Sequence, residues 1–306
     1  MVFITGMLFF ISNLTIANNH NSTIPIMNKT AKPGEFLHTW MQHNSLSNVL
    51  ILLDLDDTVL QVSNNQQLGH SEMFYHLCAE QKRKHPGMTI KEAAGRVDPL
   101  LTQVYFYQPF KLTDNRLPAV INQLKEKGAV VLGFTSRGQP LKQVTGRQLK
   151  QTGIAFTRRF DGKTIMPDNS PVYIDNGVIF AGQHCKKGDT LARLLTTNKL
   201  NKPETILLID DRKSHLENCA EALLQYKNIQ FIPVLCTYPQ EYPFVYDDKK
   251  AKNQLLDFLY TQHNKKQIAA LLRSDPFTRE LITTECNKIT DKNSKICKTL
   301  LADIRN

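Results

Sequence analysis

Residues 49–58 read VLILLDLDDT, and this stretch joins a run of apolar residues to a cluster of aspartates. An apolar run of this length without polar alternation is typical of a strand buried on both faces, as in a parallel sheet covered by helices. The aspartates Asp54, Asp56 and Asp57 follow the carboxyl end of that strand. In open α/β sheets, ligands bind beyond these carboxyl ends. The stretch therefore predicts a central strand of an α/β fold with a polar site at its end.

Other apolar runs along the chain have the same form. Residues 129–134 lead into Thr135-Ser136-Arg137, residues 205–209 lead into Asp210-Asp211, and a further strand is predicted at residues 229–235. Strands that alternate with helices predict a Rossmann-like α/β core, with a parallel sheet flanked by helices. The helical patterns between these runs lie at residues 116–127, 140–151, 190–195 and 216–225.

Local signals indicate further elements. Thr113-Asp114 is predicted to cap the helix at residues 116–127, because short polar side chains accept hydrogen bonds from the first helical N–H groups. Asp175-Asn176-Gly177 between two β-rich segments predicts a hairpin. Residues 70–108 are predicted to be helical and mixed, and residues 247–306 a Lys-rich helical extension.

The polar residues that follow three of the strands are expected to meet at one edge of the sheet. Carboxylates gathered there repel one another and raise one another's pKa values unless a cation is bound. Oxygen ligands of this kind favour Mg²⁺, which keeps coordination positions for water and phosphate. Lys186 or Lys187, at the start of a helix, could supply further positive charge. We therefore expect a Mg²⁺ site, with the candidate ligands Asp54, Asp56, Asp210 and Asp211.

Over about residues 47–236, these groups and their order resemble the haloacid dehalogenase-like (HAD) phosphohydrolase superfamily. The first motif of that superfamily, Asp-x-Asp-x-Thr after a strand, is matched by residues 54–58. The second, a strand ending in Thr or Ser, is matched by Thr135, with Ser136 as the alternative register. The third, a lysine that opens a helix, fits Lys187 better than Lys186. The fourth is the acidic pair Asp210-Asp211, with His215 standing where a further acid can occur.

Within that superfamily, the chain is most similar to an uncharacterised bacterial family, a domain of unknown function. Residues 54–60 are also similar to exported bacterial acid phosphatases. The similarity to the uncharacterised family is carried by residues 70–75, 134–138, 146–150, 176–180 and 236–238.

The resemblance implies a Mg²⁺-dependent phosphatase that hydrolyses a phosphomonoester. Asp54 would attack phosphorus and form an aspartyl-phosphate, and Asp56 would act first as general acid and then as general base. Thr135 and Lys187 would hold the phosphoryl oxygens. The Asp54 carboxylate, the Asp56 carbonyl and Asp211 would hold Mg²⁺, with Asp210 nearby. Superfamily members that break carbon–halogen bonds lack the second aspartate, so Asp56 favours phosphoryl transfer.

Thr58, Ser136 and Arg137 are the candidate substrate-binding residues, and for Arg137 a surface salt bridge is the alternative interpretation. Cap insertions at about residues 59–115 and 138–185 would select a small phosphorylated substrate. Two other functions remain open at this point. One is phosphoryl transfer to a hydroxyl acceptor, and the other is a non-catalytic host-interaction protein built on the same scaffold.

The amino-acid composition excludes several classes of protein. The 306 residues include 38 Lys and Arg against 28 Asp and Glu, a formal net charge of +10, and 41% are hydrophobic. These values exclude a disordered, collagen-like or disulfide-framework chain. The cysteines form no CxxC pair, so no zinc module is expected. The basic balance favours an anionic partner, but the sequence contains no nucleic-acid-binding motif, so no nucleic acid is expected.

The amino-terminal residues have the pattern of a signal peptide over residues 1–17, although no Lys or Arg precedes the apolar run at residues 2–11. That run is too short to span a bilayer, so no integral membrane segment is expected in the mature chain. We expect a periplasmic or secreted protein, with a cytoplasmic location as the alternative. Residues 18–46 would then form an amino-terminal segment and residues 47–246 the core. In an oxidising compartment Cys286 and Cys297 could form a disulfide, and free thiols are the alternative.

Overall fold

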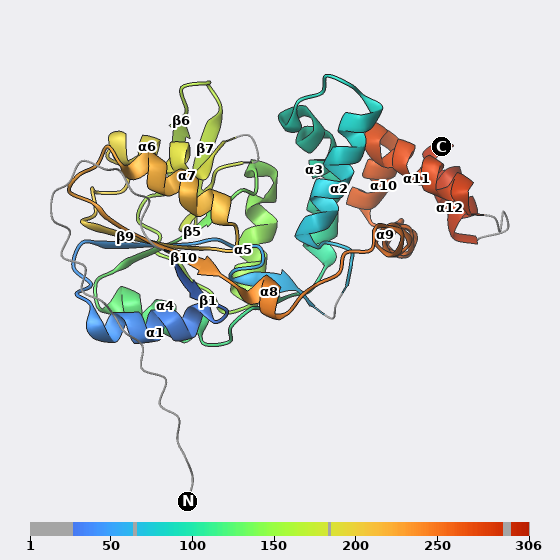
Figure 1. Cartoon of the computed structure of the whole chain (residues 1–306). Helices are drawn as coiled ribbons and strands as arrows, with labels where there is room; N and C mark the ends of the chain where they lie inside the picture. The colour runs from blue at the N-terminus through green and yellow to red at the C-terminus, as the bar shows by residue number, and fades with distance from the viewer. Residues whose placement is uncertain (1–26, 64–65, 183–184, 290–294, 306) are drawn as a thin grey trace, which may run out of the picture.

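The computed structural model describes residues 27–63, 66–182, 185–289 and 295–305. Figure 1 shows a unit built around a β-sheet and, beside it, a unit built from helices. The predicted signal peptide, residues 1–17, lies outside the described residues. The strands of the main sheet are β1 (Asn28–Thr30), β2 (Val49–Leu53), β5 (Val130–Thr135), β6 (Gly162–Ile165), β7 (Pro171–Asp175), β8 (Val178–Phe180), β9 (Thr205–Asp210) and β10 (Gln230–Cys236). The helices around it are α1 (Pro33–His43), α4 (Leu117–Glu126), α5 (Lys142–Gln151), α6 (Lys187–Thr196) and α7 (Lys213–Leu223).

The strands lie in the order β1-β10-β9-β2-β5-β8-β7-β6. Neighbours from β1 to β8 are parallel, and β7 and β6 add an antiparallel edge. Strands β2, β5 and β9 are adjacent at the centre, so their carboxyl ends lie side by side. The predicted α/β fold with a mainly parallel sheet is therefore confirmed.

Helices cover both faces of the sheet (Figure 1). Along β2, Ile51 and Leu53 pack into the core that contains α1 and α4, whereas Leu50 and Leu52 pack into the core that contains α6 and α7. Every residue of β2 is buried, as predicted for a strand covered on both faces. Full burial of a leucine or isoleucine side chain contributes about 1.5–3 kcal/mol, so these residues strongly favour the observed register.

The helix predicted at residues 116–127 is α4, but its cap differs from the prediction. Asp114 lies before the helix, and its Oδ1 accepts a hydrogen bond from the Arg116 N–H at 2.9 Å. The Oδ2 atom of the same carboxylate accepts from the Glu35 N–H, in the first turn of α1, at 3.1 Å. One aspartate therefore satisfies backbone donors at the amino ends of two helices that neighbour each other in space. Neither α1 nor the short edge strand β1 was predicted from the polar sequence around them.

The hairpin predicted around Asp175-Asn176-Gly177 is confirmed by the antiparallel pairing of β7 and β8. Asn176 and Gly177 both have positive φ, 51° and 76°, as the favoured two-residue hairpin turn requires. A Cβ atom on Gly177 would lie 2.7 Å from the Thr157 carbonyl oxygen, so no larger residue fits there. Residues 138–185, predicted as a second cap insertion, instead contribute α5 and the strands β6–β8 of the main sheet.

The helical unit combines two distant parts of the chain. Its helices share one hydrophobic core, which includes Leu77, Leu100, Leu259 and Leu272. The predicted insertion at residues 59–115 therefore packs against the carboxyl-terminal extension, and the extension is part of the same unit. A small sheet of β3 (Leu60–Val62) and β4 (Phe110–Leu112) leads into and out of the first two helices. The helices are α2 (Ser71–Lys84), α3 (Ile90–Tyr107), α9 (Asp248–Gln262), α10 (Lys266–Ser274), α11 (Pro276–Lys288) and α12 (Lys295–Arg305), and the short α8 (Tyr238–Glu241) precedes α9.

No helix within the described ranges is both long and apolar enough to cross a membrane.

Cys286 of α11 and Cys297 of α12 form a disulfide, the first of the two alternatives considered for this pair. The bond joins the last helix to the rest of the helical unit. Replacing both cysteines with serine is expected to lower the free energy of unfolding by about 2–3 kcal/mol, because the bond restricts a short loop of the unfolded chain. Urea titrations with and without reductant measure this. Reductant should destabilise the wild type by the same amount and leave the double variant unchanged; equal stability of the two proteins without reductant would contradict the prediction.

Candidate active site

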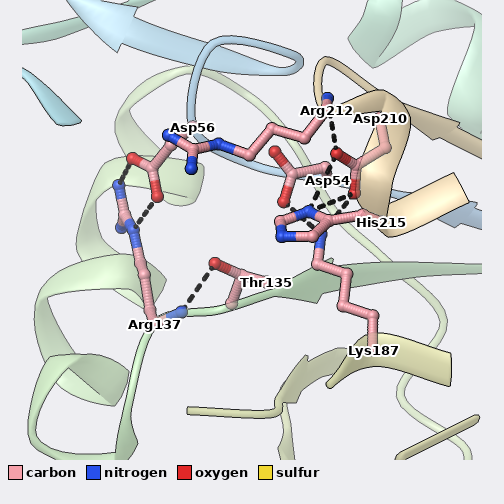
Figure 2. A network of polar contacts seen from close by, with 8 residues as sticks. All are labelled: Asp54, Asp56, Thr135, Arg137, Lys187, Asp210, Arg212 and His215. Carbon is pink, nitrogen blue, oxygen red and sulfur yellow. Dashed lines mark hydrogen bonds and ion pairs between the residues drawn. The ribbon is translucent and has the colours of Figure 1, made fainter. Parts of the chain in front are cut away.

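A cavity of about 50 Å³ lies at the carboxyl ends of β2, β5 and β9, between the sheet unit and the helices α2 and α3. Figure 2 shows part of the polar network of the sheet unit at these strand ends. The sheet unit contributes to its lining Asp54, Asp56, Asp57, Thr135, Ser136, Arg137, Gly138, Leu141, Asp211, Arg212 and His215. The helical unit contributes Ser71, Phe74, Tyr75, Asp98, Leu101 and Tyr105.

Lys187 lies between two of the predicted carboxylates (Figure 2). Its Nζ donates to Asp54 Oδ1 at 2.5 Å and to Asp210 Oδ2 at 2.6 Å, and its side chain is 1% exposed. Lys187 begins α6, and the following residue, Gly188, donates its N–H to Asn218 Oδ1 of α7 at 2.8 Å. A Cβ atom on Gly188 would lie 2.2 Å from the Asn218 carbonyl oxygen. The glycine therefore lets the start of α6 approach α7 closely enough to place the lysine at the strand ends.

A third carboxylate, Asp211, completes the acidic cluster. One oxygen from each of Asp54, Asp210 and Asp211 can be chosen so that all three lie within 4.8 Å of one another. Burial and the Asp54 and Asp210 carboxylates raise the pKa of Asp211 to about 9. Burial, together with Asp210 and Asp56, raises the pKa of Asp54 to about 7 although Lys187 opposes the change. The protein alone thus does not supply enough positive charge for all three carboxylates to ionise readily.

Asp210 and Asp211 have different surroundings. Burial disfavours ionisation of Asp210, but Lys187 and His215 together hold its pKa below the ordinary value. His215 Nδ1 lies 3.1 Å from Asp210 Oδ1, and the Arg212 N–H donates to the same oxygen at 2.9 Å. The Asp211 carboxylate, in contrast, makes no hydrogen bond or ion pair with any residue that the structure describes. Its oxygens are therefore free to hold a cation.

Arg137 does not occupy the position expected of a substrate-steering or surface residue. Its guanidinium is buried and makes a bidentate ion pair with Asp56. Nε donates to Oδ2 at 2.9 Å, and Nη2 donates to Oδ1 at 2.7 Å. Its remaining donor group, Nη1, is held by Thr145 and Gln148 of α5. The prediction of a substrate contact through Arg137 is therefore replaced by a positioning role: it fixes the Asp56 side chain, which remains 27% exposed beside the cavity.

The other predicted residues divide into two groups. Thr135 and Ser136 line the cavity, and Thr135 Oγ1 accepts from the Arg137 N–H at 3.1 Å. Thr58, predicted to bind substrate, is fully buried and is not among the lining residues. Its carbonyl oxygen accepts a hydrogen bond from the Thr113 hydroxyl, so Thr58 joins the first loop to the segment after β4.

Lining residues outside the predicted ligand and substrate-binding set also hold the helical unit against the site. Asp57, with φ of 63°, turns its carboxylate toward the first helix of the helical unit, where Ser71 Oγ donates to Oδ2 at 2.7 Å. Arg212 stacks its guanidinium on Tyr75, 4.2 Å from the ring centroid, and lies 4.0 Å from Glu72. Two residues that follow core strands thus hold α2 against the site. The signals available in the sequence were adjacency to the motifs, since Asp57 lies within the first and Arg212 follows the fourth.

The fold and the site together define the class: an α/β protein with a mainly parallel sheet and a buried lysine–carboxylate cluster at the carboxyl ends of its central strands. Residues 35–270 match the family described as "Protein of unknown function (DUF2608)", and the chain belongs to that family. A search of curated proteins found no match.

Proposed function

We propose that this protein is a Mg²⁺-dependent phosphatase of the HAD type that hydrolyses a phosphomonoester through a covalent intermediate on Asp54. The observation that carries the proposal is the placement of Asp54 at the end of the central strand. There it lies beside a buried lysine and the acidic pair that follows β9, and it faces a cavity shared with Thr135. A carboxylate nucleophile, a counter-charge for phosphate and a cation site are the parts such a reaction needs.

The donor set fits a divalent cation. Asp54 and Asp211 supply hard oxygen ligands, and Asp211 has no other partner among the described residues. Asp210 already accepts hydrogen bonds from Lys187 and the Arg212 N–H, so Asp211 is the better direct ligand of the acidic pair. When bound, Mg²⁺ supplies positive charge that offsets the phosphate and the clustered carboxylates.

Asp54 can present one free oxygen to phosphorus. Lys187 donates to Oδ1, which leaves Oδ2 for attack. The bond from Asp54 Oδ2 to phosphorus forms while the ester bond to the leaving oxygen breaks, and that oxygen takes a proton from Asp56. Water then attacks the aspartyl-phosphate, gives a proton to Asp56, and releases inorganic phosphate and free Asp54.

The bidentate ion pair between Arg137 and Asp56 affects these proton transfers. Both Asp56 oxygens accept charge-assisted hydrogen bonds, which keep the carboxylate at the cavity wall. Each oxygen retains a second lone pair, so the carboxylate can still accept a proton from water. The proton that passes to the leaving oxygen can occupy the same lone-pair position, although a protonated Asp56 accepts weaker hydrogen bonds from Arg137 than the carboxylate does.

Arg212 offers the positive charge that was first assigned to Arg137. It lines the cavity, and its side chain is 34% exposed, whereas four of the five N–H donors of Arg137 are already directed to Asp56, Thr145 and Gln148. We propose that Arg212 and Lys187 offset the negative charge of the substrate phosphate. Arg212 acts from the cavity wall, and Lys187 acts from its position beside Asp54.

Export remains part of the proposal. The disulfide between Cys286 and Cys297 supports it, because such bonds persist mainly in oxidising compartments. Rapid thiol labelling of freshly lysed cells that found both cysteines reduced would count against export.

The proposal is tested by hydrolysis of 4-nitrophenyl phosphate with Mg²⁺ and with a chelator. We expect turnover only with the metal. Mg²⁺ at about 100 times its Kd should also stabilise the wild type by about 2.7 kcal/mol, a readout that does not depend on turnover. Asp211→Asn should weaken Mg²⁺ binding about 100-fold or more by calorimetry, because it removes a direct ligand. Asp189→Asn, an exposed site on α6, is the matched control. Equal Mg²⁺ affinity in both variants would rule out the assigned site.

A further inference from the structure

The helical unit places one carboxylate in the wall of the cavity. Asp98, on α3, is half-buried and makes no hydrogen bond or ion pair with the residues that the structure describes. Burial raises its pKa to about 6. Asp98 lies beside the loop that follows Thr135, since a Cβ atom on Gly138 would lie 3.8 Å from Asp98 Oδ2. Asp98 therefore faces the catalytic loops from the opposite side.

The surroundings of Asp98 provide little compensation for its charge. The helical unit otherwise contributes to this wall mainly aromatic and aliphatic side chains, among them Phe74, Leu101 and Tyr105. A polar group removed from water without a hydrogen-bond partner costs free energy, and a charged one costs more. Four of the five N–H donors of Arg137, which also lines the cavity, are directed to Asp56, Thr145 and Gln148, and none makes a hydrogen bond to Asp98 among the described residues. A donor supplied by a bound molecule would satisfy this carboxylate.

The site consequently combines groups of opposite character. Arg212 lines the cavity and Lys187 pairs with Asp54, so a phosphate would bind on the side of Asp54 and the proposed cation. Asp98 lies on the wall of the helical unit, where the alcohol portion of a phosphomonoester would project. A second anionic group there would meet an uncompensated carboxylate, whereas an ammonium or hydroxyl group would complete its hydrogen bonding.

We propose that Asp98 is a specificity-determining residue that selects small phosphomonoesters whose alcohol carries a hydrogen-bond donor, an ammonium or a second hydroxyl group. This inference rests on the proposed phosphatase function and concerns the leaving-group side of the same site. Asp98 acts on the choice of substrate, and the bond-breaking steps remain those of Asp54 and Asp56.

The test compares kcat/KM for four probes in the wild type, Asp98→Asn, Asp98→Ala and Asp257→Asn. Phosphoethanolamine carries an ammonium, glycerol 1-phosphate carries hydroxyl groups, 3-phosphoglycerate carries a carboxylate as well as a hydroxyl, and 4-nitrophenyl phosphate carries none of these groups. We expect the wild type to favour the first two probes over 3-phosphoglycerate by at least tenfold. Both Asp98 variants should reduce that preference by tenfold or more, chiefly through KM. Asp257 is an exposed aspartate of α9 in the same helical unit, and its variant should keep the wild-type preference.

The two substitutions distinguish the two kinds of donor. Asparagine can still accept a hydrogen bond from a hydroxyl but has lost the charge that favours an ammonium, whereas alanine has lost both. An ammonium ligand therefore predicts a large loss with asparagine as well as with alanine, because both substitutions remove the charge, whereas a hydroxyl ligand predicts a loss mainly with alanine. An unchanged preference, or an equal fall in kcat/KM for all four probes, would overturn the assignment.

Failure of the proposed function can be separated from failure of this inference. If the wild type hydrolyses none of the probes, the phosphatase proposal fails. Calorimetric binding of phosphoethanolamine and glycerol 1-phosphate to the wild type and to Asp98→Asn then tests the residue directly. Tenfold weaker binding in the variant would still support the role of Asp98, while equal affinity, or no binding to either protein, would exclude it.

Discussion

Replacing Asp54 with asparagine is expected to abolish phosphoester hydrolysis, with kcat lowered by about 10⁴-fold or more, because an amide oxygen is a far weaker nucleophile than a carboxylate. The fold should persist. Asparagine has nearly the same shape, and Lys187 keeps Asp210 as its partner when Asp54 is neutral. Hydrolysis of 4-nitrophenyl phosphate measures the loss, and circular dichroism and thermal unfolding measure the fold.

Asp189→Asn supplies the matched control for this experiment, since it makes the same substitution at an exposed position of α6. Its activity should equal that of the wild type. The covalent route also predicts that brief incubation with a labelled phosphoester leaves acid-stable label on wild-type protein and none on Asp54→Asn. Retention of more than a few per cent of turnover by the folded variant would exclude Asp54 as the nucleophile.

The second large effect concerns stability. Lys187→Met is expected to lower the free energy of unfolding by about 3–5 kcal/mol. It removes the lysine ammonium from a buried cluster and leaves the Asp54 and Asp210 carboxylates without their ion-pair partner. Its carboxylate partners outweigh the effect of burial and raise the pKa of Lys187 above its ordinary value. The stabilisation it gives is therefore fully present at neutral pH, below the pKa of the unfolded chain, and is lost only as the pH rises through the folded value. Urea titration at pH 7 measures the difference.

The neighbouring lysine provides the control. Lys186 is exposed, directly precedes α6, and was the alternative match to the same motif. Lys186→Met should change stability by less than about 0.5 kcal/mol. Added Mg²⁺ should restore part of the stability of Lys187→Met, because a cation at Asp54 and Asp211 reduces the same repulsion. If the two variants were equally stable, the buried lysine would not be the counter-charge of the cluster.

The strand positions could be predicted because they depend on local sequence. The apolar runs at residues 49–53 and 205–209 are long enough to fill a strand and lack polar alternation, and both lie in the centre of the sheet. Their carboxyl ends then had to bring Asp54 and Asp210 together, since adjacent parallel strands end at the same edge. β1 was missed because a short edge strand of polar residues has no such signal.

The roles of Arg137 and Thr58 could not be obtained in the same way. Both follow strands within motifs, and sequence position alone suggested that their side chains face the ligand. Arg137 instead folds back onto Asp56 because α5 supplies Thr145 and Gln148 to satisfy its remaining donors. Thr58 is buried within the loop that leads to β3. Whether a side chain points into a cavity or into the protein depends on the elements packed around it.

By itself, the sequence determined the central strands and the helices between them, the edge where the acidic groups gather, and the lysine that begins α6. These follow from hydrophobic periodicity and from the geometry of parallel strands, which act over short distances along the chain. Only the tertiary structure decided that the last helices complete the unit formed by α2 and α3, and that Asp98 and Arg212 line the cavity. Such contacts join residues far apart in sequence, and they depend on which apolar helix faces bury one another when the whole chain packs.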